Sequence, residues 1–254
     1  EVDVGREGRG PLRIERFAGL HVWKRTSLRQ PGTQHRSDVV ARHHGDPQVA
    51  ADRCEVCTDL FGERSGVRVA YGACRPDGEA VENGGLVAEI EGPLRAILEG
   101  ERLALNFLMK LSGIATHVRE WASAAGESGL RVVDTRKTTP LLRALEKRAV
   151  RHGGAHNHRM ALYDGVMIKD NHIQAVGSIG EAVARVRAEV HHLVKIEVEV
   201  TNTAELLEAL EARADVVMLD NMDDAQLAEC VRITRERRPS TFLEASGNMD
   251  PVRI

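Results

Sequence analysis

The chain has 254 residues, of which 42% are hydrophobic and 29% charged, and its formal net charge is −3. This composition favours a buried core over disorder, and the negative balance argues against a protein that holds nucleic acid by a global positive field. No apolar run approaches the roughly 20 residues of a membrane span, and no apolar signal segment opens the sequence, so we expect a cytoplasmic protein without membrane or nucleic-acid partners.

Residues 1 to about 50 are rich in Arg and His and keep neither helical nor strand periodicity, so we expect a tail or a loosely ordered arm. After this segment the periodicity of apolar residues becomes regular. Alternation at 67–71 and 86–90, with turn residues between them, predicts strands. We therefore expect residues 1–98 to form a small N-terminal domain of the α+β, sandwich-like type.

Leucine and isoleucine recur near helical spacing from Leu94 to about Ala125, which predicts a long helix. After it, short apolar runs alternate with amphipathic segments. The runs predict strands at 130–133, 165–168, 193–200, 215–219 and 241–243, and the intervening segments predict helices at 141–150, 179–190, 206–212 and 225–237. Asn202, with Glu205 three residues later, is typical of a helix N-terminus. This alternation predicts a parallel sheet with right-handed crossovers.

The run at 193–200 favours one kind of parallel sheet over another. Alternate residues from Val194 to Val200 are apolar, whereas Lys195, Glu197 and Glu199 share the opposite face. In a doubly wound sheet helices would cover that charged face as well, at a high desolvation cost. In a barrel it lines the lumen. We therefore predict an α/β barrel over residues 99–254, with an open doubly wound sheet as the alternative.

Charged residues gather where the predicted strands end. They are Arg136, Lys137, His158, Arg159, Lys169, Glu199 and Asp220, followed by the Ser246-Gly247 turn. A barrel brings strand ends to one rim, where converging cations need an anionic ligand such as a carboxylate or a phosphate. Glu199 and Asp220 suit Mg²⁺ or ribose hydroxyls, and the Ser-Gly turn suits a phosphate. For Arg136 and Lys137 taken alone, a solvated loop with incidental charge is the alternative.

From Gly100 to Asn248 the chain resembles the quinolinate phosphoribosyltransferase family. The matching segments are Glu101-Arg-Leu-Ala-Leu-Asn-Phe-Leu-Met-Lys-Leu-Ser-Gly-Ile-Ala-Thr116, Asp134-Thr-Arg-Lys-Thr-Thr-Pro140, Asn157-His-Arg159, Ile168-Lys-Asp-Asn-His172, Lys195-Ile-Glu-Val-Glu-Val200, Met218-Leu-Asp-Asn221 and Glu244-Ala-Ser-Gly-Asn248. The resemblance implies transfer of phosphoribose from phosphoribosyl pyrophosphate (PRPP) to quinolinate, with loss of CO₂, giving nicotinate mononucleotide for NAD biosynthesis.

The resemblance also implies residue roles. Quinolinate would be held by Arg136, His158, Arg159 and Lys169, together with Arg102 reaching from the neighbouring subunit of a homodimer or higher oligomer. Lys137, Glu199 and Asp220 would be catalytic and would bind PRPP and its Mg²⁺. Asn221, Ser246, Gly247 and Asn248 would complete the PRPP and phosphate site.

The sequence departs from the family pattern at several places. Leu141 follows Pro140 where the family usually has glycine, and Ala155 replaces the third of three glycines. The usual N-terminal motif is not recognisable in residues 1–60, and we expect a barrel that is incomplete, or truncated, at its C-terminus. Two alternatives to the active enzyme therefore stay open: a non-catalytic barrel of this family, and a paralogue that uses another aromatic ring acid.

Overall fold

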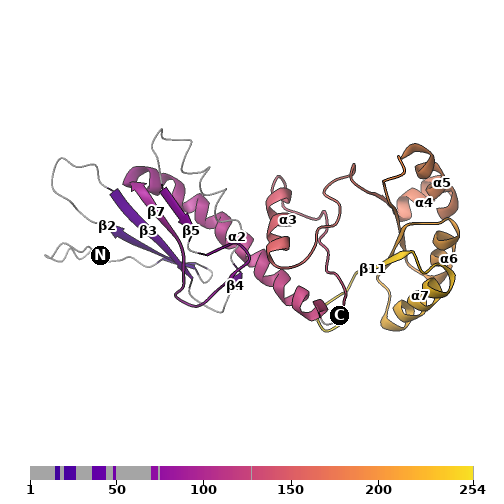
Figure 1. The fold of residues 1–254 in the computed structure, drawn as a ribbon. Coiled ribbons are helices and arrows are strands. Elements are labelled where there is room, and N and C mark those ends of the chain that lie inside the picture. Colours follow the sequence, from indigo (N-terminus) through magenta and orange to yellow (C-terminus); the bar gives the residue numbers. More distant parts are fainter. Residues whose placement is uncertain are drawn as a thin grey trace. The chain divides into compact units, whose positions relative to one another are not determined.

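The computed structural model describes residues 15–17, 20–26, 36–43, 48–49, 70–73, 75–126 and 128–253. The chain divides into two compact units, Glu1–His158 and Arg159–Ile254, and each is described by itself. Figure 1 shows the elements of both units in chain order.

The first unit contains a five-stranded antiparallel sheet in the order β1-β2-β3-β7-β5 (Figure 1). Its strands are β1 (Glu15–Phe17), β2 (Leu20–Thr26), β3 (Arg36–His43), β5 (Ala70–Ala73) and β7 (Leu86–Pro93). The expectation of a tail or loose arm before residue 50 was therefore wrong for the described strands. Strand β3 pairs along its length with β7, about 50 residues later in the sequence, so this sheet depends in part on non-local pairing that local periodicity does not reveal.

The long helix predicted after this sheet is confirmed as α2 (Leu94–Gly126). Its residue Leu108 packs with Val81 and Val87 in one buried cluster, and Val81 belongs to β6 (Ala80–Val81), which pairs with β4 (Gln48–Val49). Further along the helix, Leu111 and Ala115 pack against Ala149 of α3 (Arg143–His152). The apolar residues of α2 therefore pack both against the two-stranded sheet of β4 and β6 and against α3.

The apolar run at 130–133 does not form the predicted strand. Its one ladder contact is an isolated parallel bridge between Val133 and His156, and Leu130 is 59% exposed. The main-chain N–H of Asp134 donates to His156 O (3.1 Å), and that of His156 donates to Val132 O (2.9 Å). This bridge holds two loops side by side, each of which carries residues predicted to bind ligand.

The second unit contains a four-stranded parallel sheet in the order β11-β10-β9-β8. Its elements are β8 (Val166–Ile168), α4 (Asp170–Val176), α5 (Ile179–Glu189), β9 (Ile196–Val200), α6 (Thr203–Glu211), β10 (Val216–Asp220), α7 (Asp224–Arg237) and β11 (Phe242–Ser246). Each strand lies beside its predecessor in the chain, and the order never reverses. This is the order of a barrel wall, whereas a doubly wound sheet reverses its order at a switch point.

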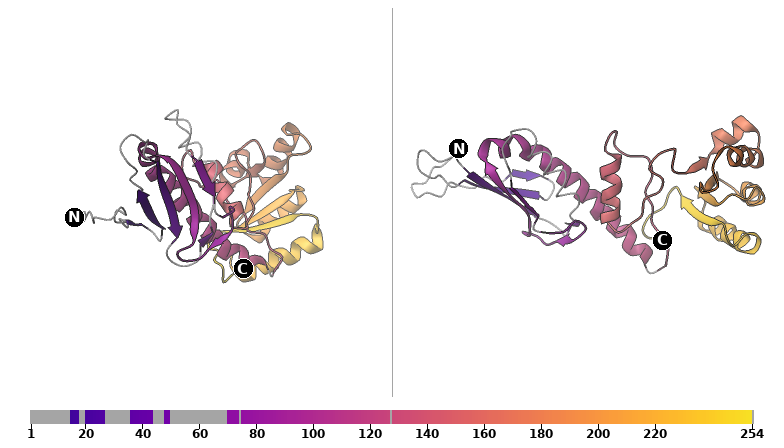
Figure 2. Two further views of the ribbon diagram at one scale, coloured as in Figure 1. Left: turned by 60° about the vertical axis from the view of Figure 1, so that its left-hand side comes forward. Right: turned by 45° about the horizontal axis from the view of Figure 1, so that its top comes forward.

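One face of this sheet is apolar and covered by helices. Ile196, Val198 and Val200 of β9 are fully buried and pack in one cluster with Ile179 of α5 and Leu206 of α6. Figure 2 shows the helices of this unit gathered over that side of its strands. The prediction that alternation at 193–200 separates an apolar face from a charged one is confirmed for β9.

Two differences from the sequence expectation concern the strand ends. Asp220 is the last residue of β10 rather than the first residue of a loop. Lys169 precedes a short helix, α4, that periodicity did not reveal, because none of its seven residues is buried. The expected N-terminus at Asn202 is confirmed, since its side chain accepts the Glu205 N–H (3.0 Å).

Sheet order and the single helix layer together give the second unit the architecture of part of an α/β barrel, and an α+β region precedes it in the sequence. The predicted domain boundary between residues 98 and 99 stays a prediction. Among the described residues, no helix is long and apolar enough to span a membrane.

Candidate functional site

The uncovered face of the parallel sheet carries the charged residues that alternation predicted. Strand register pairs Glu199 with Met218 and Met218 with Glu244, and pairs Asp220 with Ser246 one pleat further along. Residues paired in this way share a face, so Glu199, Asp220 and Ser246 lie on one side of the sheet near the carboxyl ends of its strands. Lys169 follows β8 at the same edge. In parallel α/β folds this edge is where ligands bind.

Lys169 and Glu199 form an ion pair at this edge. Lys169 Nζ donates to Glu199 Oε2, and the carboxylate side chain is 16% exposed while the lysine is 41% exposed. The Lys169 main-chain N–H donates to Nδ1 of His172, which fixes the start of α4 (2.9 Å). The structure therefore brings together a cation predicted to bind quinolinate and a carboxylate predicted to serve PRPP and Mg²⁺.

The next two strand ends are joined by a small polar network. Asn221 donates its N–H to Ser246 O (2.8 Å) and its side-chain amide to Asp220 Oδ2 (2.7 Å). Gly247 has φ +82°, and a Cβ at that position would lie 2.1 Å from Asn221 Oδ1, so only glycine fits this turn. Asn248 donates to the same Oδ1 (3.3 Å). Five residues predicted for the PRPP and phosphate site therefore meet at the ends of β10 and β11.

Arg253 stabilises this turn through hydrogen bonds. Its guanidinium donates to Asn248 O (2.7 Å) and Met222 O (3.3 Å), and its Nε donates to Asp224 Oδ1 (3.1 Å). Sequence reasoning missed this residue, since a single Arg after the last matched motif carries no pattern of its own.

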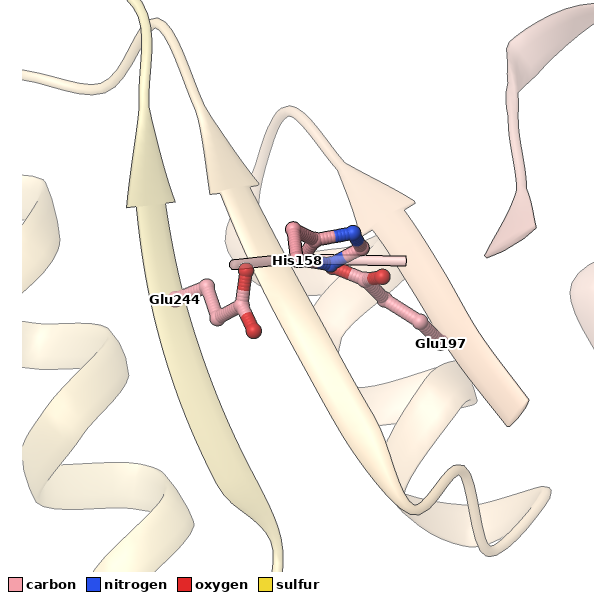
Figure 3. Close-up of side chains that lie close together, drawn as sticks. All are labelled: His158, Glu197 and Glu244. Atoms are coloured by element: carbon pink, nitrogen blue, oxygen red, sulfur yellow. The ribbon is translucent and has the colours of Figure 1, made fainter. Parts of the chain in front are cut away.

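A second pair of carboxylates lies deeper on the same face. Glu197 on β9 and Glu244 on β11 place carboxylate oxygens within 4.8 Å of each other, and Figure 3 shows both side chains. Glu197 is 5% exposed. His158, which Figure 3 also labels, is the last residue of the first unit. Hard oxygen ligands of this kind suit Mg²⁺.

In the first unit, the loop 134–142 presents Arg136 and Lys137 next to each other. Arg143 holds the loop through Thr138 Oγ1 (3.2 Å) and Arg136 O (3.3 Å). Neither the Arg136 nor the Lys137 side chain has an acidic partner in the part of the chain that the structure describes. Two adjacent cations without a counter-charge form a site that favours an anion.

Glu146 of α3 anchors the same loop. Its Oε2 accepts the Thr139 N–H (3.1 Å), and its Oε1 lies 3.0 Å from Lys110 Nζ on α2. Burial raises the pKa of Glu146, but the hydrogen bonds from Thr139 and Lys110 outweigh burial and leave the pKa below the ordinary 4.5. The carboxylate is therefore held ionised, which keeps both contacts in place.

The remaining predicted residues are distributed between the units. Arg102 lies on the exposed surface of α2, and His158 ends the first unit. Arg159 opens the second unit and donates from Nη1 to Gly165 O (2.8 Å). Their roles in binding quinolinate stay predictions.

One edge of the parallel sheet carries Lys169, paired carboxylates and a glycine turn, and these groups suit an anionic small molecule. The comparisons with known proteins identify its family. A model of the quinolinate phosphoribosyl transferase C-terminal domain matches residues 114–254, and the N-terminal domain model matches residues 28–112. The chain belongs to this family. The N-terminal match begins well before Gly100, where the sequence motifs became recognisable.

Individual relatives agree. A probable nicotinate-nucleotide pyrophosphorylase [carboxylating] of Synechocystis is 49% identical over 68% of this chain and 59% of its own length. One from Methanothermobacter thermautotrophicus is 40% identical over 88% of this chain and 79% of its own. The structure of the nicotinate-nucleotide pyrophosphorylase from Francisella tularensis matches with a TM-score of 0.80 at 32% identity, over 88% of this chain and 78% of that one. The chain spans about three fifths of the length of the first two curated relatives it matches (59% and 60%).

Proposed function

We propose that this protein is a pentosyltransferase that makes nicotinate mononucleotide from quinolinate and PRPP, releasing CO₂ and pyrophosphate. The observation that carries the proposal is the shared edge of the parallel sheet, where Lys169, Glu199, Asp220 and Ser246 end consecutive strands on one face. The names of the relatives support the same reaction. NAD biosynthesis is the process that such a product would supply.

Quinolinate carries two carboxylates on a pyridine ring and needs cations held in fixed positions. We assign Arg136, His158, Arg159 and Lys169 to this acceptor. Arg136 fits the role best, since its guanidinium has no acidic partner among the described residues and can donate two parallel hydrogen bonds to a carboxylate.

The part of the site that we assign to PRPP contains groups for its phosphate and groups for its ribose and Mg²⁺. The turn of Ser246, Gly247 and Asn248 is shaped for a phosphate, since its glycine conformation lets main-chain N–H groups approach an anion. Glu199 and Asp220 offer carboxylate oxygens to ribose hydroxyls or to the Mg²⁺ that accompanies PRPP, and their chemistry fits that ion. When bound, Mg²⁺ would neutralise charge on the pyrophosphate group.

Catalysis in this assignment rests on positioning and electrostatics. Lys137 would stabilise the charge that develops on pyrophosphate as the bond to the sugar breaks, and Glu199 and Asp220 would stabilise the cationic sugar. The quinolinate nitrogen then takes the place of pyrophosphate at the sugar carbon. The positive charge of the resulting pyridinium stabilises the electron pair that CO₂ leaves on the adjacent ring carbon, and that carbon then takes a proton from water, so decarboxylation follows ribosylation.

We further propose a homodimer or larger homo-oligomer in which Arg102 contributes to the neighbouring site. Its exposed position on α2 supports this assignment. Sedimentation together with an Arg102→Ala variant tests it: a dimer that binds quinolinate with unchanged affinity after the substitution would remove Arg102 from the acceptor site.

The main test is direct. The purified chain is incubated with quinolinate, PRPP and Mg²⁺, and nicotinate mononucleotide is measured with nicotinate as the competing acceptor. Product from quinolinate alone supports the proposal. Equal use of nicotinate would indicate a paralogue with another acceptor, and tight binding of quinolinate without product would indicate a non-catalytic relative.

A further inference from the structure

Helix α3 contains a lysine whose side chain is almost completely buried. Lys147 is 1% exposed, and its neighbours in the sequence are charged residues that are typical of a solvated helix surface. Lysine is rarely buried to this extent unless its ammonium group is fully paired. The mechanism described above assigns it no task.

Both partners of the ammonium group lie in loops that carry proposed acceptor residues. Lys147 Nζ donates to Asp134 Oδ1 and to the main-chain carbonyl of His158 (3.1 Å). Asp134 begins the loop of Arg136 and Lys137, so a single buried cation contacts both loops at their bases.

Asp134 completes a closed network. Its Oδ1 also accepts the N–H of His158 (2.9 Å). When the amide nitrogen of Asn157 is placed facing the two nearby acceptors, it donates to Asp134 Oδ2 (3.0 Å) and to Lys147 O (2.9 Å). The two main-chain polar groups of His158 are therefore bound by the two members of one ion pair.

We propose that Lys147 and Asp134 are positioning residues that fix the main chain of His158 against the Arg136-Lys137 loop and so set the geometry of the acceptor site. This inference rests on the proposed function for its kinetic consequence, but its structural part does not. Direct contact with substrate is not part of it, because Lys147 is buried beneath both loops.

The physical reason is the cost of moving a buried ion pair. A charge removed from water is stable only while its partners stay in place, so the pair resists any shift of either loop. A surface ion pair between the same elements would allow such shifts at little cost. Displacement of a binding group by about 1 Å can lower the rate on the order of a hundredfold.

Two variants separate positioning from stability. Lys147→Met leaves the Asp134 carboxylate buried without its cation, so we expect lower thermal stability. Pairing it with Asp134→Asn removes both charges together, and replacing both partners of a buried ion pair is far less destabilising than replacing one. Lys110→Met is the matched control, since it removes another lysine that is paired with α3 but has no contact with His158.

The first readout needs no activity. Amide hydrogen exchange at His158 should be faster in Lys147→Met and in the double variant than in the wild type or in Lys110→Met. The second readout is kinetic. The KM for quinolinate should rise about tenfold or more in both Lys147 variants, since a charge-assisted contact is lost, while the KM for PRPP changes less.

The outcomes are distinct. A double variant that regains both wild-type stability and the wild-type KM for quinolinate would show that Lys147 is only structural and would overturn the inference. Unchanged protection of the His158 amide in both variants would do the same. Faster exchange in a protein whose wild type makes no nucleotide would support the positioning network but contradict the proposed function.

Discussion

Leu141 is held in a backbone conformation that leucine adopts at a cost. Its φ is +66°, in the left-handed region, and its side chain is 102% exposed, so it gains nothing from packing. The residue lies near the end of the loop 134–142, which carries Arg136 and Lys137. Replacing it with glycine removes the Cβ that causes the strain.

We expect Leu141→Gly to stabilise the protein. The left-handed conformation costs a residue with a Cβ about 1–2 kcal/mol, and the greater freedom of glycine in the unfolded chain offsets about 0.5–1 kcal/mol of that gain. At the midpoints of these two ranges, the net increase in the free energy of unfolding is about 0.75 kcal/mol. For a chain of this size this corresponds to a rise in Tm of about 1–4 °C.

Urea unfolding of the wild type, Leu141→Gly and Leu141→Ala measures the effect. The alanine variant is the matched control, because it removes the same exposed side chain but keeps the Cβ and hence the strain. We expect it to lie within about 0.5 kcal/mol of the wild type. If the glycine variant were no more stable than the alanine variant, the strain at Leu141 would be absent and the reasoning refuted.

Three further predictions concern the site. Arg136→Ala should raise the KM for quinolinate about 10- to 100-fold and that for PRPP much less, because about 1.5–3 kcal/mol of charge-assisted bonding is lost; equal effects on both substrates would contradict the assignment. Glu199→Gln should weaken Mg²⁺-dependent use of PRPP and free Lys169 from its ion pair, and unchanged metal dependence in initial-rate assays would make Glu199 a structural carboxylate. The pKa of Glu146 is lower in the folded protein than in the unfolded chain, so its contribution to stability is present above pH 4.5 and is lost as pH falls through the folded pKa. Glu146→Gln should therefore be less stable than the wild type at neutral pH. In thermal melts this difference in stability should shrink towards low pH.

The parts of the fold that the sequence revealed are those set by neighbouring residues. The face of β9 follows from alternation at i and i+2, and the cap at Asn202 follows from Asn202 and Glu205, which are three residues apart. The strands before residue 50 could not be read in this way, because β2 and β3 show no regular alternation of apolar and polar residues and β3 gains part of its hydrogen bonds from β7, far along the chain. Helix α4 was missed because it has only seven residues, of which Ile173 and Val176 alone pack, partly buried, against the core.

The candidate site also has features that the sequence predicts and features that it does not. Residue types at strand ends identified Lys169, Glu199 and Asp220, because the edge of a parallel sheet brings together whatever follows its strands. Their pairing was not foreseen. The proximity of Lys169 to Glu199 depends on how far each side chain reaches across two neighbouring strands, and no sequence spacing encodes that reach.

Lys147 is the clearest example of a residue whose burial the sequence does not predict. In the sequence it stands among charged residues of a helix whose other charges face solvent or partly buried partners, and periodicity gives no reason to single it out. Its burial arises because Asp134 and the His158 main chain meet above α3, which requires the bridge between Val133 and His156 to bring two loops together first. Local pattern can indicate which residues are charged and which face of a strand they take. Which of those charges is buried depends on the tertiary contact that removes water from it, and at Lys147 that contact is made by Asp134 and the main chain of His158.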